Sequence, residues 1–207
     1  MITLHHLHAS RSIRILWLLE EIGQPYQLIT YQRDAKTHLA PASLKAIHPL
    51  GKSPVIELDG KVIAESGAIV ELLIKKFAPH LAPDELSPEY SDYLQWIHFA
   101  ESSAMLPFLL KIFNRYETQS GTSLKFLDHY AEIEFKKVFS YLNDYLNGKT
   151  FLVEERLTGA DFMLAFVVQS ALKNLKCDDT YPHIKSYIEN LESLSSYQKA
   201  MQIEANE

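Results

Sequence analysis

Residues 51–66 have the sequence GKSPVIELDGKVIAES, and this stretch decides the class of fold. Two short apolar runs flank Asp59-Gly60, a dipeptide that favours the tight two-residue turn of a β-hairpin. Directly after the second run, Ser66 is a typical helix-capping residue, and apolar residues at near-helical spacing follow as far as Phe77. The stretch therefore predicts two antiparallel strands followed by a helix.

The residues before this stretch indicate a strand, a helix and a second strand. Residues 2–7 have the pattern of a short strand, and 13–22 form an apolar helix that Gly23 ends and Pro25 prevents from continuing. Residues 26–31 again have the pattern of a strand. A strand–helix–strand unit implies parallel strands with a right-handed crossover. The whole order, βαβ then ββα, predicts an α/β domain with a mixed four-stranded sheet.

The rest of the chain has only helical patterns. Three prolines among acidic residues mark 79–88 as an exposed linker, so we expect one domain at 1–78 and a second at 89–207. The expected helices are 90–116, 123–146, 161–175, a shorter one from Pro182 and a tail from Ser195. The segment 161–175 is apolar nearly all round, as a helix in the middle of a bundle is. The second domain is therefore expected to be an all-α bundle.

The composition limits the classes of function. The 20 Lys and Arg are scattered and outnumbered by 26 Asp and Glu, which argues against a nucleic-acid partner. No apolar run approaches the about 20 residues of a membrane span, and the first residues lack the pattern of a secretion signal. The single cysteine, Cys177, allows neither an intrachain disulfide nor a Cys-x-x-Cys redox centre. We therefore expect a cytoplasmic protein with no membrane or nucleic-acid partner.

The order of elements and three motifs together resemble the cytosolic glutathione transferase superfamily. The motifs are Ser10-x-x-x-Arg14 at the first helix, Gly51-Lys52-Ser53-Pro54-Val55 and Glu65-Ser66. Each is weak alone, but together at these spacings they are specific, and they are most similar to the serine-type bacterial and fungal branch. The resemblance covers the whole chain. It implies a thioredoxin-like first domain that binds glutathione.

The resemblance also implies the reaction. Such an enzyme activates the glutathione thiol as a thiolate for attack on hydrophobic electrophiles, with reduction of organic peroxides as a further expected activity. A free thiol has a pKa of about 8.5 and is only a few per cent ionised at neutral pH. Lowering that pKa by about two units requires about 2.7 kcal/mol of preferential stabilisation of the thiolate. Glutathione is then a co-substrate, no cofactor is bound permanently, and the expected assembly is a homodimer.

By analogy with the serine-type branch, the Ser10 hydroxyl is the predicted hydrogen-bond donor to the glutathione sulfur. Ser12 is the reserve candidate, and either serine could instead simply cap the helix. In similar proteins the proline at position 54 follows a cis peptide bond, so we predict that Ser53-Pro54 is cis. The backbone of Ser53 would then pair with the cysteinyl part of glutathione like an added strand.

The resemblance assigns the charged ends of glutathione to other positions. Glu65 is predicted to bind the γ-glutamyl ammonium, while Ser66 and the N–H groups at the helix N-terminus bind the neighbouring carboxylate. Lys52 and His38 stand where similar enzymes hold the glycyl carboxylate. The expected second-substrate pocket contains Met105 and Phe108, with Leu106 and Phe113 as further candidates. For each of these residues a plain structural role, as a helix cap, solvated charge or core side chain, stays open.

Three further interpretations stay open. A glutathione-dependent cis–trans isomerase is one, although Ser10-Arg11-Ser12 departs from the Ser-Ser-Cys-like run of that branch. The second is a non-catalytic, transferase-like interaction module, such as those of translation and stress-response proteins, which often lose motifs that this chain keeps. The third, a metal site at His5-His6-x-His8, is disfavoured because strand alternation separates His5 from the other two. Thr158-Gly159-Ala160-Asp161 fits an N-capping box with a role in folding.

Overall fold

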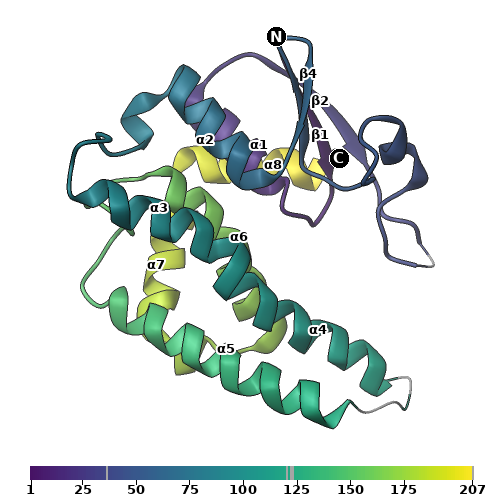
Figure 1. Cartoon of the computed structure of the whole chain (residues 1–207), viewed down its shortest axis with the longest axis vertical. Helices are drawn as coiled ribbons and strands as arrows, with labels where there is room; N and C mark the ends of the chain where they lie inside the picture. Colours follow the sequence, from purple (N-terminus) through teal and green to yellow (C-terminus); the bar gives the residue numbers. More distant parts are fainter. Residues whose placement is uncertain (36, 120, 122–123, 207) are drawn as a thin grey trace. The chain divides into compact units, whose positions relative to one another are not determined.

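The computed structural model describes residues 1–35, 37–119, 121 and 124–206 (Figure 1). Its contacts divide the chain into two compact units. The first unit contains Met1–Ala82 together with Glu192–Glu207, and the second contains Pro83–Leu191. The change from one unit to the other after Ala82 falls inside the linker expected at 79–88. The grouping of the C-terminal segment with the first unit was not expected from the sequence.

A mixed four-stranded sheet forms the first unit, with the strand order β2-β1-β3-β4. The strands are β1 (Ile2–Leu7), β2 (Tyr26–Tyr31), β3 (Val55–Leu58) and β4 (Lys61–Ala64). Strand β1 pairs in parallel with β2 and antiparallel with β3, and β3 pairs antiparallel with β4. At the turn between β3 and β4, Asp59 and Gly60 both have positive φ, at 52° and 76°, as a two-residue hairpin turn requires. The predicted βαβ–ββα order is confirmed.

Three helices complete the first unit: α1 (Ile13–Ile22), α2 (Ser66–Phe77) and α8 (Ser195–Asn206). Helix α1 is buried from Ile13 to Leu19, because α8 packs along it (Figure 1). The indole Nε1 of Trp17 donates to Ser196 Oγ at 3.0 Å, and the Tyr197 ring meets the Trp17 ring edge-on at 5.3 Å. Both contacts come from α8. A helix that is apolar nearly all round must be covered on the side away from the sheet as well, and α8 provides this cover for α1.

Two local details of the first unit differ from the expected pattern. Glu65, not Ser66, stands at the N-cap of α2, and Ser66 is the first helical residue. The polar stretch 34–48 contains a short 3₁₀ helix, η1 (Ala42–Ala46), which the sequence did not predict. Leu44 is its single anchor and is completely buried. One buried side chain is too weak a periodic signal to predict an element.

The second unit consists of helices. They are α3 (Glu89–Phe99), α4 (Met105–Gln119), α5 (Lys125–Tyr145), α6 (Gly159–Leu175) and α7 (Pro182–Glu192). A π-helical turn, η3 (Ala100–Ala104), joins α3 to α4, so the single helix expected at 90–116 contains a local widening (Figure 1). The expected start of the next helix at Ser123 lies outside the described residues. A one-turn 3₁₀ segment, η4 (Asp178–Thr180), precedes α7, and another, η2 (Pro79–Leu81), follows α2 in the first unit.

The N-terminus of α6 carries the predicted capping box. The fully buried Asp161 carboxylate accepts hydrogen bonds from Thr158 N at 2.8 Å, Leu152 N at 3.0 Å and Tyr187 Oη at 2.9 Å. Burial raises the pKa of Asp161 to about 6, although the donated hydrogen bonds act in the opposite direction. One carboxylate therefore ties the start of α6 to the preceding loop and to α7. In the described part of the chain, no helix combines the length and apolarity needed to cross a membrane.

Candidate active site

The start of α1 brings two serines against the end of strand β1. Ser12 is completely buried, and its Oγ lies 2.7 Å from His6 Nδ1. The same oxygen accepts a hydrogen bond from Leu7 N at 3.2 Å and lies 3.2 Å from Leu7 O. Ser12 is thus a structural link between α1 and β1. Its hydroxyl does not cap the helix, because it points to the strand.

The hydrogens of this cluster can be assigned from its acceptors. Ser12 has one hydroxyl hydrogen, and the acceptors next to it are His6 Nδ1 and Leu7 O. Ser10 Oγ accepts from Ser12 N at 3.1 Å and lies 3.1 Å from Ser12 Oγ. The hydrogen of Ser10 is therefore the one that can turn toward a ligand. Ser10 also keeps 7% of its surface exposed, whereas Ser12 keeps none.

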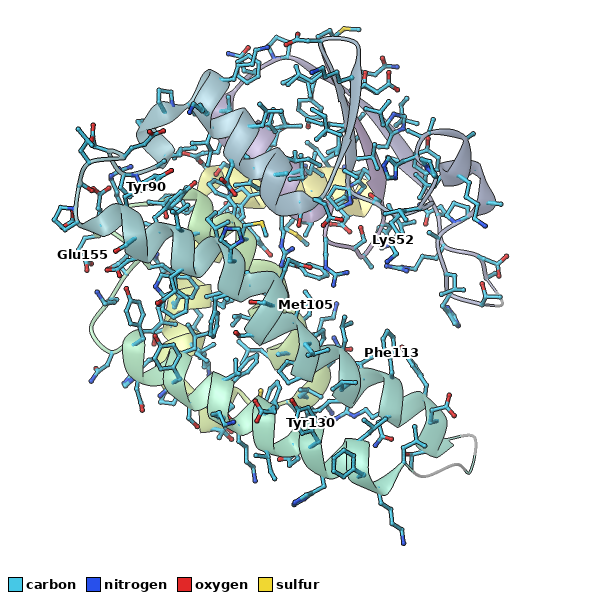
Figure 2. The ribbon with its side chains drawn as sticks, in the orientation of Figure 1. Lys52, Tyr90, Met105, Phe113, Tyr130 and Glu155 are labelled. Atoms are coloured by element: carbon cyan, nitrogen blue, oxygen red, sulfur yellow. The ribbon has the colours of Figure 1, made fainter. Side chains whose placement is uncertain are left out.

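The loop before β3 meets the same end of β1. Ser53 Oγ donates to His5 O at 2.8 Å and accepts from Leu7 N at 3.2 Å, so Leu7 N is shared between Ser12 and Ser53. The Ser53–Pro54 peptide bond is cis, as predicted. Pro54 is buried, while Lys52 is exposed (Figure 2). Ser10, Ser12 and Ser53 thus lie around one strand end.

A fourth serine of the candidate site, Ser66, is held by a residue of α1. The Arg14 side chain is almost completely buried, and its Nη1 donates to Ser66 Oγ at 3.0 Å. Arg14 belongs to the Ser10-x-x-x-Arg14 motif, and its burial shows that it is not a solvated residue. Glu65, next to Ser66, is exposed and has φ 70° and ψ 109°, a conformation that is strained for a residue with a side chain.

His38 stands apart from this group. It is exposed and has φ 57°, and its carbonyl oxygen accepts from Arg33 Nη1 at 3.0 Å. Within the described part of the chain, no hydrogen bond joins the side chain of His38 or Lys52 to the serines. Both side chains have the exposure that a ligand-binding residue needs, and among the described residues no side-chain hydrogen bond or ion pair orients them.

The candidates for the second-substrate pocket have different environments. Met105 and Phe108 are 2% and 5% exposed and belong to the core of the second unit. Leu106 and Phe113 on the same helix are 54% and 56% exposed; Figure 2 labels Met105 and Phe113 on α4 and Tyr130 on α5. A cavity of about 490 Å³ in this unit is lined by aromatic and apolar side chains, among them Phe99, Leu106, Tyr130 and Tyr141, together with the polar or charged residues Ser102, Ser103, Glu134 and Lys137. We call it the α4–α5 cavity. Met105 and Phe108 do not line it.

The histidines of β1 have partners other than a metal. His5 Nδ1 lies 2.9 Å from Tyr31 Oη, and His5 Nε2 lies 2.8 Å from Glu57 Oε1. His6 faces the opposite side, toward Ser12. No group of three or more metal-binding side chains occurs among the residues that the structure places. The sequence alone did not indicate the contact of His6 with Ser12, since adjacent histidines in a strand carry no signal of their partners.

Both parts of the chain match family models. Residues 1–74 match the glutathione S-transferase N-terminal domain, and residues 105–200 match the glutathione S-transferase C-terminal domain. The chain is 33% identical to glutathione S-transferase 3 of Schizosaccharomyces pombe, over 91% of this chain and 81% of that protein.

Solved structures give the same result. A glutathione S-transferase from Actinobacillus pleuropneumoniae superposes with a TM-score of 0.88 at 36% identity, covering 99% of this chain and 93% of that one. A glutathione transferase homologue from Lodderomyces elongisporus, with two glutathione molecules per subunit, has the same fold at a TM-score of 0.80 and 20% identity, over 98% of both chains. The chain therefore belongs to the glutathione S-transferase family, and its activity is that of a glutathione transferase.

Proposed function

We propose that the first unit binds glutathione with the thiol at Ser10, and that the Ser10 hydroxyl donates a hydrogen bond to the thiolate. The observation that carries this proposal is the difference between the two serines. Ser12 is completely buried and engaged by His6 and Leu7, whereas Ser10 keeps some exposure and, among the described residues, its hydrogen has only the neighbouring Ser12 hydroxyl within reach. Serine is too weak an acid or base to titrate here, so its contribution is the hydrogen bond.

The remainder of glutathione would extend from Ser10 across β3 to the start of α2. The backbone of Ser53, beside Pro54, would pair with the cysteinyl part. The first N–H groups of α2 have no partner within the helix and would bind the γ-glutamyl carboxylate. Ser66 supports this role, because its oxygen accepts from Arg14 and its own hydrogen can then point to a carboxylate.

Charged side chains would hold the two ends of the tripeptide. Glu65 would pair with the γ-glutamyl ammonium, and its strained backbone supports this role because such conformations concentrate at ligand sites. Lys52 and His38 would hold the glycyl carboxylate. Both are exposed, so each ion pair would be weak on its own. We expect their contribution to be smaller than that of Glu65 and Ser66.

The bound thiolate would attack a hydrophobic electrophile. A sulfur–carbon bond forms, and the leaving group departs with its electron pair. Met105 and Phe108, our candidates for the second-substrate pocket, are buried. We therefore propose that they hold α4 in place from the core and do not contact the substrate directly. Phe113 on the same helix is exposed and does not line the α4–α5 cavity, so it is better placed to contact an apolar substrate.

A homodimer is part of the proposal. Around the α4–α5 cavity, the exposed side chains include Leu106, Tyr130 and Tyr141, and Phe126 is 78% exposed at the start of α5. Apolar clusters of this kind on a protein surface mark interaction sites, and two-fold homodimers are the commonest oligomers. We propose that a second copy of this chain covers these residues. We also propose a reducing compartment such as the cytoplasm, consistent with a single cysteine.

Retention on immobilised glutathione and turnover of a panel of electrophiles test the proposal together. A non-catalytic interaction module would bind without turnover of any electrophile, and an isomerase would act on maleylacetoacetate-like substrates without consuming glutathione. We expect both retention and glutathione consumption. Loss of retention in Ser66→Ala, in a variant that circular dichroism shows to be folded, would locate the bound glutathione at the start of α2.

A further inference from the structure

A carboxylate from the last helix reaches the loop that carries Ser10. The backbone N–H of Ala9 donates to Glu204 Oε1 at 2.7 Å, across a sequence separation of 195 residues. Glu204 lies on α8 and is only 7% exposed. A buried carboxylate is costly unless it is hydrogen-bonded, so its position here is a specific one. The contact lies directly next to the proposed sulfur-binding residue.

The other side of the same residue is held as well. The carbonyl oxygen of Ala9 accepts from Arg33 Nη2 at 2.9 Å. Ala9 has φ 50°, a left-handed conformation that a residue with a Cβ seldom adopts. Two charge-assisted hydrogen bonds, one at each side, therefore hold Ala9 in a conformation that it would not prefer alone. The direction in which the chain enters Ser10 depends on that conformation.

Glu204 also faces the histidine that holds Ser12. His6 Nε2 lies 3.9 Å from Glu204 Oε1, and it makes no hydrogen bond with any residue that the structure describes. Burial lowers the pKa of His6, while the Glu204 charge raises it and His8 lowers it. A neutral His6 next to this carboxylate favours the tautomer with hydrogen on Nε2. Nδ1 is then the acceptor for the Ser12 hydroxyl.

These contacts form a continuous series from α8 to the proposed sulfur site. We propose that Glu204 is a positioning residue for thiol activation: it fixes Ala9 and the His6 tautomer, and so directs the Ser10 hydroxyl to the sulfur. The inference rests on the proposed role of Ser10. Glu204 does not touch glutathione in this account. It acts through the Ala9 N–H and through the pair of His6 and Ser12.

A purely structural role of Glu204 in docking α8 is the alternative. Ser196 provides the matched control, because it also joins α8 to α1, through Trp17, but hydrogen-bonds with neither Ala9 nor His6. Ser196→Ala should lower the unfolding temperature and leave the chemistry of the bound thiol unchanged. Glu204→Ala should change both.

The experiment is a titration of the ultraviolet thiolate absorbance of glutathione bound to the full-length chain, with kcat and KM for an electrophile. We expect Glu204→Ala to raise the pKa of the bound thiol by about 0.5–1 unit, in the direction that Ser10→Ala raises it. The rate kcat should fall about three- to tenfold near neutral pH, with KM for glutathione nearly unchanged. Glu204→Gln still offers an oxygen to the Ala9 N–H, so it should shift the titration less.

Two outcomes overturn the inference while keeping Ser10 as the sulfur-binding residue. One is a raised pKa of the bound thiol in Ser10→Ala together with an unchanged pKa of the bound thiol in Glu204→Ala. The other is an equal shift in Ser196→Ala and Glu204→Ala, which would assign the effect to the docking of α8. No shift in either Ser10→Ala or Glu204→Ala overturns the proposed role of Ser10 and this inference with it. If Glu204→Ala does not fold, Glu204→Asp, which withdraws the carboxylate from Ala9, is titrated in its place with the same criteria.

Discussion

Arg14 Nη1 donates a hydrogen bond to Ser66 Oγ at 3.0 Å, and this contact joins the first turn of α1 to the first residue of α2. The two helix starts are the places where the proposed site meets the sulfur and the γ-glutamyl group of glutathione. Arg14 is buried, so the contact is little screened by solvent. The orientation of Ser66 therefore depends on a residue that does not itself contact the ligand in our proposal.

The first prediction concerns this contact. Arg14→Met removes the donor with little loss of volume, so Ser66 loses its fixed orientation. We expect the affinity for glutathione to fall about tenfold and the free energy of unfolding to fall by about 1–3 kcal/mol, measured by calorimetry and denaturant titration. A double-mutant cycle with Ser66→Ala should give a coupling of about 1 kcal/mol in glutathione binding. Additive losses in the cycle would show that the two residues act independently.

The second prediction concerns backbone strain at Glu65. Glu65→Gly removes the proposed ammonium partner, but glycine adopts the positive φ without steric cost. We expect weaker glutathione binding together with a gain of up to about 1 kcal/mol in the free energy of unfolding. Glu65→Ala is the control, since it loses the carboxylate and keeps the strain, so it should bind glutathione weakly with no gain in stability. Equal stability of the two variants would contradict a strained Glu65.

The third prediction separates the two serines. Ser10→Ala should leave the affinity for glutathione nearly unchanged and raise the pKa of the bound thiol, because the lost hydrogen bond favours only the thiolate. If that bond contributes about 1.5–3 kcal/mol, turnover at neutral pH should fall about ten- to a hundredfold and recover as the pH approaches the new thiol pKa. Thiolate absorbance of bound glutathione measures the shift.

Ser12→Ala is the counterpart of Ser10→Ala. It removes the link between α1, His6 and Leu7, so we expect a loss of about 1–3 kcal/mol in the free energy of unfolding and a smaller shift of the thiol titration than in Ser10→Ala. A larger shift in Ser12→Ala than in Ser10→Ala would reverse the two roles. A wild-type titration in both variants would mean that another group, such as a backbone amide or Arg11, stabilises the sulfur.

The fourth prediction concerns the pH dependence of stability at Asp161. Since burial raises its pKa to about 6 in the folded chain, the folded state binds a proton more tightly than the unfolded state between about pH 4 and pH 6. Tighter proton binding by Asp161 in the folded state adds to the free energy of unfolding. This contribution is complete below about pH 4 and is lost as the pH rises through about 6. The free energy of unfolding of the wild type minus that of Asp161→Asn should therefore decrease over this window.

A matched variant supports the reading of that experiment. Tyr187→Phe removes one hydrogen-bond donor to Asp161 and keeps the titratable carboxyl group. It should lower the free energy of unfolding by about 1 kcal/mol, and its difference from Asp161→Asn should still depend on pH. If the difference in the free energy of unfolding between the wild type and Asp161→Asn is constant from pH 4 to pH 6, the donated hydrogen bonds outweigh the effect of burial on the pKa of Asp161. The carboxylate would then be charged across the whole range.

The fifth prediction is that the chain sediments at twice its 23.7 kDa mass at micromolar concentration. Tyr130→Glu places a charge at the α4–α5 cavity, where we propose that the second copy packs. It should shift the sedimentation toward one chain mass, whereas Lys173→Glu, on α6 outside the cavity lining, should not. A wild-type mass of one chain would contradict the homodimer.

The fold could be predicted largely because its signals are local. The Asp59-Gly60 turn, the Gly23 helix end and the Thr158 capping box are each determined by a few adjacent residues, and the structure confirms them. The sequence was less informative at η1, where a single residue, Leu44, carries the burial.

The candidate site was predictable only in part. Ser10, Ser53 and Ser66 belong to motifs that the sequence displays, but the residues that orient them are distant in sequence. Glu204 reaches Ala9 from the far end of the chain, and no periodicity or spacing indicates such a contact. Arg14 lies within a motif, but an arginine at the start of a helix shows no local pattern that would predict its burial. Long-range polar contacts of this kind become visible only in three dimensions.

The packing of α8 on α1 has a consequence for folding during synthesis on the ribosome. The helical unit 83–191 is inserted between two segments that build a single unit, so the sheet appears early but its last covering layer appears late. Until α8 emerges, Trp17 and the Ala9 loop would stay without the Ser196 and Glu204 partners that hold them. The loop that carries the proposed sulfur-binding residue is therefore completed only after α8 has been made, and a nascent chain stalled before α8 would carry the motifs of the enzyme without the contacts that finish its proposed active site.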